Sequence, residues 1–171
     1  MSAEEDVQLV EAGARDAQAV LELLTQLDGQ SETFTVEDDL SQLSEAAEAK
    51  QLALIQESRE NLIFLAKYQG QAIGLVTIIE MPDSHLGELG VAVLKPYWNQ
   101  GLGTALVEES LTWGQTFSWL DGFFLTVQAR NKAAYHIYQK LGFKEIAHNK
   151  NGYHDKKGNR YPTIDMQLLF N

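Results

Sequence analysis

The sequence predicts an α/β or α+β domain built on a mixed β-sheet, and three observations carry this prediction. Short runs rich in β-branched and aromatic residues alternate in hydropathy, as strands do, whereas longer segments place apolar residues at helical spacing. One strand–helix–strand unit spans residues 86–127, which favours two parallel strands joined by a right-handed crossover. With 171 residues and 44% hydrophobic composition the chain can bury a full core, so we expect a single domain over residues 1–171.

The N-terminal part is expected to contribute a strand and two helices. Residues 7–12, VQLVEA, are typical of a short strand. Residues 15–27 have apolar side chains at helical spacing, and this helix should end near Gly29. Residues 35–58 predict a second helix, because acidic residues in its first turn suit the helix dipole. A break within this second helix is left open.

Three strands should follow these helices. Residues 61–70 and 71–81 are strand-like, and they meet at Gln69-Gly70, which is typical of a hairpin turn. The alternation over residues 85–94 predicts the third strand. Gly90 interrupts this third run, which indicates either a β-bulge or the close approach of another backbone.

The C-terminal part should alternate helices and strands. The next helix runs to about Phe117, with an apolar face formed by Leu102, Leu106, Trp113 and Phe117. A strand over residues 121–129, a helix over 131–142 and two strands around a polar loop within 143–170 complete the pattern. The element order is therefore β-α-α-β-β-β-α-β-α-β-β, which predicts a mixed sheet.

Composition and charge exclude several functions. A net charge of −11 argues against nucleic acid or an anionic membrane as partner, and no stretch approaches the roughly 18 apolar residues of a membrane span. The sequence has no cysteine, which excludes disulfides, a thiolate nucleophile and a thiolate metal site. The N-terminus, MSAEEDVQLV, does not have the pattern of a signal peptide, so we expect a cytoplasmic protein.

The charge is distributed unevenly along the chain. Residues 1–60 hold 15 acidic and 3 basic side chains, a net charge of −12, and the remaining residues hold 9 acidic and 10 basic ones, a net charge of +1. This pattern suits an anionic cofactor beside a cationic substrate. A solvated acidic surface that aids solubility explains the same pattern.

A glycine-containing turn, WNQGLGTAL over residues 98–106, leads directly into a helical pattern. Glycine at the start of a helix lets an anion approach the free N–H groups and the positive end of the dipole. No lysine follows the second glycine, so the turn is not a P-loop, and the third glycine of a dinucleotide-binding fingerprint is missing. Taken alone, the turn is equally well explained as a tight connection that binds nothing.

Gly90 changes this balance, because a strand that parts from its neighbour leaves N–H and C=O groups free within the sheet. An extended ligand that carries amides could pair with those groups as a surrogate strand. A pyrophosphate at the turn and an amide chain along the strand together describe the pantetheine arm of coenzyme A.

Two segments resemble the signatures of the GNAT superfamily of acetyl-CoA-dependent N-acetyltransferases. VAVLKPYWNQGLGTALVE, residues 91–108, is similar to its pyrophosphate-binding motif, written Q/R-x-x-G-x-G/A and followed by a helix. NKAAYHIYQKLGF, residues 131–143, is similar to its second signature, an Asn, then Ala and Tyr, then Gly-Phe. The resemblance implies a mostly antiparallel sheet of about seven strands with a central, splayed parallel pair, about four helices, and acetyl-CoA as cosubstrate.

The resemblance also implies which residues bind the cofactor. They are Val91, Ala92 and Val93 on the strand, Asn99, Gln100, Gly101, Leu102, Gly103 and Thr104 in the turn, and Asn131 at the start of the later helix. Trp98 departs from the Gln or Arg of the motif, and Asn99 stands where many members have glycine. Because backbone amides hold the pyrophosphate in this family, cofactor binding should survive, with Arg130 and Lys132 as alternative sources of positive charge or as solvated surface residues.

Acetyl transfer to an amine needs a base and an acid, because a primary amine has a pKa near ~10 and a leaving thiolate must be protonated. By resemblance Tyr138 is the general acid, and a core tyrosine packed on the helix face is the alternative. Tyr135 is expected to be a packing residue. Asn131 should cap this helix, with Gly142 at its C′ position.

For the base we favour Glu88, because it lies next to the point where sulfur and amine should meet. The alternation places it on the opposite sheet face from Leu89, where it is either a buried base or an exposed strand glutamate. His85 is the alternative base, and Glu80 is a weaker one. The N–H of Val91 is expected to stabilise the oxyanion.

The sequence therefore predicts an N-acetyltransferase that moves the acetyl group directly to a primary amine, on a small molecule or on a protein N-terminus or lysine. A non-catalytic acyl-CoA-binding or sensor module of the same fold is the alternative, and a nucleotide-binding domain is disfavoured. No metal is expected, since His136, His148 and His154 with Asp155 lack convincing ligand spacing. The polar segment 148–162 is expected near the acceptor cleft, where it shapes selectivity or a homodimer contact.

Overall fold

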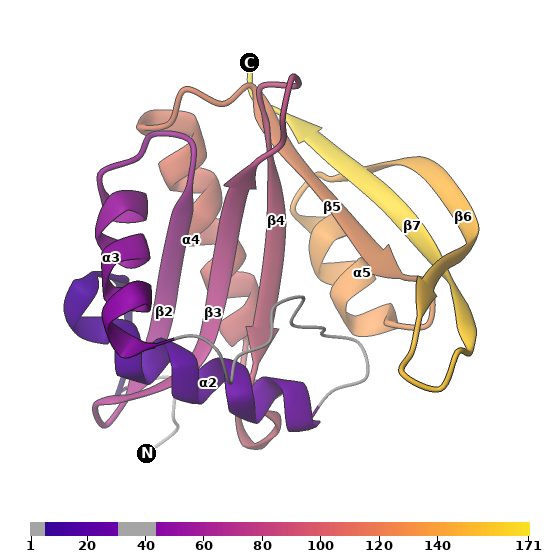
Figure 1. Cartoon of the computed structure of the whole chain (residues 1–171). Helices are drawn as coiled ribbons and strands as arrows, with labels where there is room; N and C mark the ends of the chain where they lie inside the picture. Colours follow the sequence, from indigo (N-terminus) through magenta and orange to yellow (C-terminus); the bar gives the residue numbers. More distant parts are fainter. Residues whose placement is uncertain (1–5, 31–43) are drawn as a thin grey trace.

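The computed structural model of the chain describes residues 6–30 and 44–171, which form one seven-stranded sheet in the order β1-β2-β3-β4-β5-β7-β6 (Figure 1). The strands are β1 (Val7–Glu11), β2 (Leu62–Tyr68), β3 (Gln71–Glu80), β4 (Leu86–Val93), β5 (Gly122–Gln128), β6 (Lys144–His154) and β7 (Arg160–Leu169). The helices are α2 (Ala17–Gln30), α3 (Glu45–Gln56), α4 (Leu102–Thr116) and α5 (Lys132–Lys140), with short 3₁₀ turns η1 (Ala14–Asp16) and η3 (Lys95–Tyr97). Every strand pairing is antiparallel except that of β4 with β5, which confirms the predicted mixed sheet and its parallel pair.

The helices cover both faces of the sheet (Figure 1). α2 crosses in front of the sheet on β3, and α3 lies beside α2 on β2, whereas α4 lies behind and packs across β2, β3 and β4. The largest fully buried side chains come from both layers and include Leu23 and Leu27 of α2, Leu106 of α4 and Phe123 of β5. The core therefore packs the helices of both layers against the sheet.

Local sequence signals explain where several elements begin and end. Gln69 and Gly70 both have positive φ, 52° and 79°, as a two-residue hairpin turn requires, which confirms the predicted turn between β2 and β3. Ser44 caps α3 by accepting the N–H of Ala47 at 3.0 Å. The predicted second helix over residues 35–58 is confirmed in its later part, and residues 35–43 lie outside the described residues.

The predicted apolar face of α4 is confirmed for Leu102, Leu106 and Trp113, which are buried, whereas Phe117 stays 47% exposed although its ring lies 6.5 Å from that of Trp113. The helix ends at Thr116, and Phe117 is its C-cap residue with φ −121°. The Arg59 guanidinium lies over the Phe117 ring, with Cζ 4.8 Å from its centroid.

β4 and β5 pair at only three positions and then separate. The parallel register joins Leu86, Gly87 and Glu88 to residues 122–124. β4 continues to Val93 in register with β3, and β5 continues to Gln128 in register with β7. Because each strand follows its outer neighbour, a gap opens between them after Glu88, as the resemblance implied.

Gly90 does not form the expected bulge. The register of β3 with β4 runs without a shift through the pair Thr77–Gly90, so no extra residue is inserted there. Gly90 does mark a close contact, since a Cβ at this position would lie 3.2 Å from the Oγ1 atom of Thr77. The neighbour that approaches is thus a side chain, and the strands separate without help from a bulge.

Candidate active site

The gap-facing edge of β4 directs the backbone groups of alternate residues away from β3. The N–H of Met81 bonds to the carbonyl of Leu86 at 2.8 Å, and the N–H of Leu94 bonds to the carbonyl of Ile73 at 2.9 Å. In an antiparallel pair the hydrogen-bonded positions alternate, so the even-numbered residues of β4 bond to β3. The N–H and C=O groups of Val91 and Val93 therefore face the gap between β4 and β5.

This register separates the three strand residues predicted to bind the cofactor. Val91 and Val93 present backbone donors and acceptors to the gap, whereas Ala92 lies opposite Leu75 at a position that bonds to β3. Any contact of Ala92 with a ligand in the gap must therefore be made by its side chain. An edge of this kind can accept an extended, amide-bearing ligand as an additional strand.

At the C-terminal end of β4 the chain turns sharply into α4. Gly101 is the N-cap residue of α4, with φ 80° and ψ 4°, and Asn99 also has a positive φ of 63°. Asn is the non-glycine residue that tolerates this left-handed conformation best, which explains why it can stand where relatives have glycine. The predicted cofactor turn is thus shaped by two left-handed residues.

The N-terminus of α4 has the features of an anion-binding site. Within the described part of the chain, no side chain caps this helix, and its first intrahelical bond runs from Ala105 to the Gly101 carbonyl at 3.0 Å. The N–H groups of Leu102, Gly103 and Thr104 precede that bond and lie at the positive end of the helix dipole. Such an arrangement binds phosphate without a basic side chain.

Two side chains of the turn have surroundings that the sequence did not reveal. The indole Nε1 of Trp98 donates to the carbonyl oxygen of Val93 at 2.6 Å. The Oε1 atom of Gln100 is buried without a hydrogen-bond partner among the described residues. Motif comparison identified Trp98 as unusual, but only the fold shows that its donor reaches back to the strand edge.

The second motif lies beside this turn. A Cβ added to Gly103 would lie 3.7 Å from the Cδ1 atom of Ile137, so α5 packs against the first turn of α4. Asn131 caps α5 by accepting the N–H of Ala134 at 3.2 Å, as predicted. The structure therefore brings together two motifs that are separated by about thirty residues in sequence.

The C-terminus of α5 is fixed by a Schellman motif. Gly142 has a φ of 105° and donates to the carbonyl of Gln139 at 3.1 Å, while the N–H of Phe143 donates to the carbonyl of Tyr138 at 3.0 Å. The prediction of Gly142 as the C′ residue is confirmed. This cap holds the last turn of the helix, which carries Tyr138.

Tyr138 is buried, with 6% of the residue exposed, and its ring packs edge-on against Phe143 with 5.8 Å between centroids. Burial disfavours the phenolate and raises the pKa of Tyr138 well above its ordinary value of 10.0. The hydroxyl therefore keeps its proton at neutral pH, as a general acid must before it reacts. The packing expected of a core tyrosine and the protonation expected of an acid are both present.

Tyr135 is not simply a packing residue. Its hydroxyl donates to the Oε1 atom of Glu145 at 2.5 Å, and the Oε2 atom of Glu145 lies 2.9 Å from Nε2 of His148. The hydrogen bond to the Glu145 carboxylate raises the pKa of Tyr135 and lowers the pKa of Glu145. These hydrogen bonds lie at the exposed surface of β6. Tyr138 is therefore the tyrosine of α5 that faces the core.

The three candidate bases occupy different positions around the end of β3 and the start of β4. Glu88 is exposed and is the last residue of β4 that pairs with β5, so it stands where the gap begins. Glu80 lies opposite Gly87, and this register places its side chain on the other sheet face from Glu88. His85 is exposed in the turn, with a φ of 55°, and its carbonyl accepts the N–H of Asp121 at 2.8 Å.

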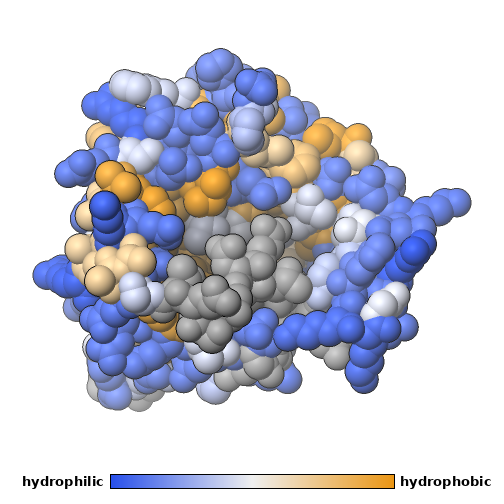
Figure 2. All heavy atoms as spheres, viewed as in Figure 1, coloured by the Kyte–Doolittle hydropathy of each residue, from blue (hydrophilic) through white to orange (hydrophobic). Residues whose placement is uncertain are grey.

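The face on which Glu88 lies can be identified from Gly74. A Cβ at Gly74 would lie 3.4 Å from Leu106 of α4, and Gly74 pairs with Val93. Odd-numbered residues of β4 therefore face α4, and Glu88 faces the side that α2 covers. From that side the molecule is mainly hydrophilic, with apolar residues in smaller groups (Figure 2).

Arg130 is occupied by neighbouring side chains. Its guanidinium lies over the Tyr161 ring, with Cζ 3.6 Å from the centroid, and its Nε donates to Gln128 at 2.8 Å. A cation held in this way is less available to a phosphate than a free side chain would be. Lys132, the other expected source of positive charge, is exposed in the first turn of α5.

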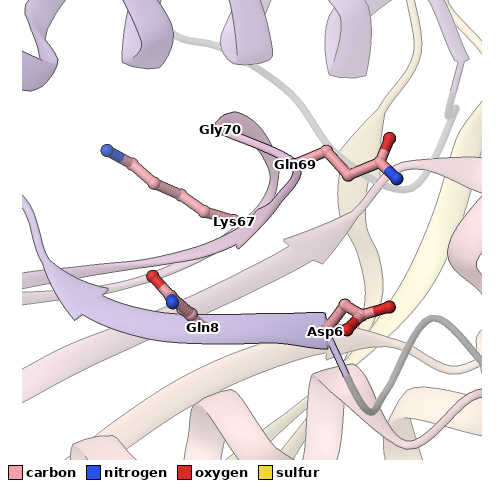
Figure 3. A pocket seen from close by; sticks show the side chains of 5 residues that line it. All are labelled: Asp6, Gln8, Lys67, Gln69 and Gly70. Atoms are coloured by element: carbon pink, nitrogen blue, oxygen red, sulfur yellow. The ribbon is translucent and has the colours of Figure 1, made fainter.

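A surface pocket of about 400 Å³ lies at the β1 edge of the sheet, around β1 and the β2–β3 turn (Figure 3). Asp6, Gln8, Lys67, Gln69 and Gly70 line it. β2 and β3 separate this edge from β4, so the pocket is distinct from the gap. Among residues 6–30 and 44–171 no cluster of three potential metal ligands occurs, and none of the described helices is long and apolar enough to cross a membrane.

The chain belongs to the acetyltransferase (GNAT) family, whose sequence model matches residues 21–143. This match confirms the resemblance on which the cofactor site was predicted. The matched region contains the gap, the turn and both motifs. Members of this family use acetyl-CoA as the acetyl donor.

Two acetyltransferases of related sequence match part of the chain. An N-alpha-acetyltransferase from Sulfurisphaera tokodaii is 32% identical over 98 residues, which are 51% of this chain and 59% of the relative. A spermidine N(1)-acetyltransferase from Escherichia coli is 32% identical over 81 residues, 47% of this chain and 44% of the relative. The chain thus spans only about half the length of these relatives.

A solved structure matches nearly the whole chain. The acetyltransferase of the GNAT family from Streptococcus pneumoniae superposes with a TM-score of 0.86 and 30% identity, covering 96% of this chain and 99% of the other. Agreement at this level confirms the fold.

Proposed function

We propose that this protein transfers the acetyl group of acetyl-CoA directly to a primary amine. The observation that carries the proposal is the continuity of two binding features: the gap-facing edge of β4 at Val91 and Val93 leads through η3 to the N-terminus of α4, which no described side chain caps. An extended amide chain suits the first feature and a pyrophosphate suits the second. Acetyl-CoA carries both, joined in this order.

The amides of the turn bind the pyrophosphate in this proposal. Asn99, Gln100, Gly101, Leu102, Gly103 and Thr104 supply them, with Asn131 contributing from the start of α5. The turn contains no lysine or arginine, so affinity depends on N–H geometry and the dipole of α4.

The reaction then proceeds in the gap. The amine nitrogen attacks the thioester carbonyl carbon, and the N–H of Val91 stabilises the oxyanion that forms. As the C–S bond breaks, the Tyr138 hydroxyl gives its proton to the leaving sulfur. Glu88 removes the amine proton, directly or through water, with His85 as the alternative base.

The acceptor we propose is a cationic amine, on a polyamine, another small molecule, or a protein N-terminus or lysine. Glu88 lies on the sheet face that α2 covers, and α2 and α3 carry the exposed acids Glu22, Asp28 and Glu45. Carboxylates attract cationic amines and raise their local concentration. The names of the two relatives, one acting on α-amino groups and one on spermidine, agree with this class.

Release of free thiol from acetyl-CoA, measured with a panel of amines and with acetylated products identified by mass spectrometry, tests the proposal. We expect turnover above background with at least one cationic amine. Tight acetyl-CoA binding without turnover on any amine would instead support the alternative, a non-catalytic acyl-CoA-binding or sensor module. Tyr138→Phe and Glu88→Gln distinguish these functions further, because both should lower turnover while acetyl-CoA binding is retained.

A further inference from the structure

Trp98 joins the turn before α4 to the edge of β4. Its indole Nε1 lies 2.6 Å from the carbonyl oxygen of Val93, within hydrogen-bond distance. The residue is 45% exposed, and the ammonium of Lys95 lies 5.7 Å from the centre of its ring. The side chain therefore forms a hydrogen bond through its indole N–H, and its ring is partly exposed to solvent.

The acceptor of this bond belongs to the gap. Val93 is at a position whose backbone groups face away from β3, so its carbonyl is one of the groups that the β4 edge directs into the gap. With that carbonyl occupied, the edge presents the N–H and C=O of Val91 and the N–H of Val93. At Val91 and Val93 the indole thus leaves two donors and one acceptor facing the gap.

The turn itself has few other restraints from side chains. Asn99 and Gly101 are in the left-handed conformation, and α4 begins without a side-chain cap in the described residues. Backbone bonds from Tyr97 to Leu94 and from Trp98 to Lys95 close η3, but they end before Asn99. The bond from Trp98 to Val93 is a link between the turn and the strand across this junction.

We propose that Trp98 is a positioning residue that fixes the phosphate-binding turn against the gap-facing edge of β4. The spacing between turn and edge decides whether the pantetheine arm and the pyrophosphate of one acetyl-CoA molecule can bind together. This inference rests on the proposed function, because it assumes that one donor molecule spans both features. Trp98 acts through backbone geometry and not through contact with the reacting atoms.

The test compares two acetyl donors of different reach. S-acetyl-pantetheine can occupy the strand edge but carries no pyrophosphate, whereas acetyl-CoA engages both edge and turn. Trp98→Phe keeps an aromatic ring and removes the donor, and Trp98→Gln restores an uncharged N–H donor. Trp119→Phe is the matched control. Trp119 is 67% exposed and lies just before β5, whose first residues pair with β4, so it is not part of the separated end of the two strands.

For Trp98→Phe we expect the Kd for acetyl-CoA to rise about 3- to 10-fold, because one hydrogen bond is lost. The Kd for S-acetyl-pantetheine should change less than about 2-fold. Trp98→Gln should recover part of the loss, and Trp119→Phe should bind both donors as the wild type does. Melting temperatures measured in parallel show whether each variant is folded.

Three results would overturn the role of Trp98. They are equal losses for both donors, no loss for either, or tighter acetyl-CoA binding by Trp98→Phe, which would mean that the indole competes with the pantetheine arm. Failure of the proposed function looks different, because the wild type would then bind neither donor, or would bind acetyl-CoA without acetylating any amine. In the second case the binding comparison still decides whether Trp98 positions the turn.

Discussion

Phe143 contacts Tyr138 twice: its N–H donates to the Tyr138 carbonyl at 3.0 Å, and the two rings pack edge to face with 5.8 Å between centroids. The first contact ends α5 and the second orients the phenol. Because both contacts survive when only the hydroxyl is removed, the role of that hydroxyl can be tested without disturbing the helix.

Tyr138→Phe should lower kcat by about 10²-fold, the lower range for loss of a general acid, with little change in acetyl-CoA affinity. Burial raises the pKa of Tyr138, so the wild-type hydroxyl stays protonated and should cause no loss of activity as pH rises to about 10. The measurement is kcat against pH for both proteins, with isothermal titration of acetyl-CoA. Unchanged turnover in the variant would rule out Tyr138 as the acid.

Glu88→Gln should lower kcat by about 10²-fold and flatten the acidic limb of the pH–rate profile, because the amide cannot accept the amine proton. His85→Gln serves as the matched variant for the alternative base. A profile that keeps its acidic limb in Glu88→Gln and loses it in His85→Gln would transfer the role to His85.

The two glycines of the turn should respond differently to substitution. Gly101 has a φ of 80°, where a β-branched residue is strained, so Gly101→Val should weaken acetyl-CoA binding about 30-fold, a cost of ~2 kcal/mol. At Gly103 a Cβ would make an ordinary 3.7 Å contact with Ile137, so Gly103→Ala should change the Kd less than about 3-fold. Titration of both variants beside Trp98→Ala, which should lose less than Gly101→Val, checks the order.

If Gly101→Val bound acetyl-CoA as tightly as the wild type, the left-handed turn would not be the pyrophosphate site. Circular dichroism of each variant would show whether a weakened site simply reflects a poorly folded α4.

Asp16 stabilises the connection between β1 and α2 and should make stability depend on pH. Burial alone would raise the pKa of Asp16, but the bonds from the Gly13 N–H at 2.8 Å and from Lys67 at 2.5 Å lower it below 3.8. A lowered folded-state pKa adds stability above the unfolded-state value of ~3.9, and this stability is lost as pH falls through the folded-state pKa. Asp16→Asn should therefore cost about 1–2 kcal/mol at pH 7 and progressively less below pH ~4.

Urea unfolding at pH 7 and at several acidic pH values measures this difference. Glu22→Gln, on the exposed face of α2, is the control that should show little change. A constant difference between wild type and Asp16→Asn at every pH would mean that the charge of Asp16 is not responsible.

The sequence predicted the elements that follow local rules. The hairpin at Gln69-Gly70, the Asn131 cap and the glycine after α5 each depend on a few adjacent residues, and each is confirmed. The prediction that the turn binds a cofactor rests on combining two motifs, because either alone also fits a connection that binds nothing.

Features that depend on contacts between distant parts of the chain could not be predicted from local sequence. Gly90 predicts either a bulge or the close approach of another backbone, but the separation of β4 from β5 follows from the pairing of each strand with its outer neighbour. The bond from Trp98 to Val93 depends on how the turn folds back after η3, which no local pattern encodes.

The separated strands leave an edge in the middle of the sheet, after Glu88, that is not completed by another strand among the described residues. Open edges of this kind are normally protected, because they can pair with other chains. A cosubstrate that completes the ladder would act as a folding partner as well as a reactant. The melting temperature should then follow the donor concentration, with about 2.7 kcal/mol of added stability at a hundred times the Kd, so the supply of this ligand would also set how much of the protein stays folded.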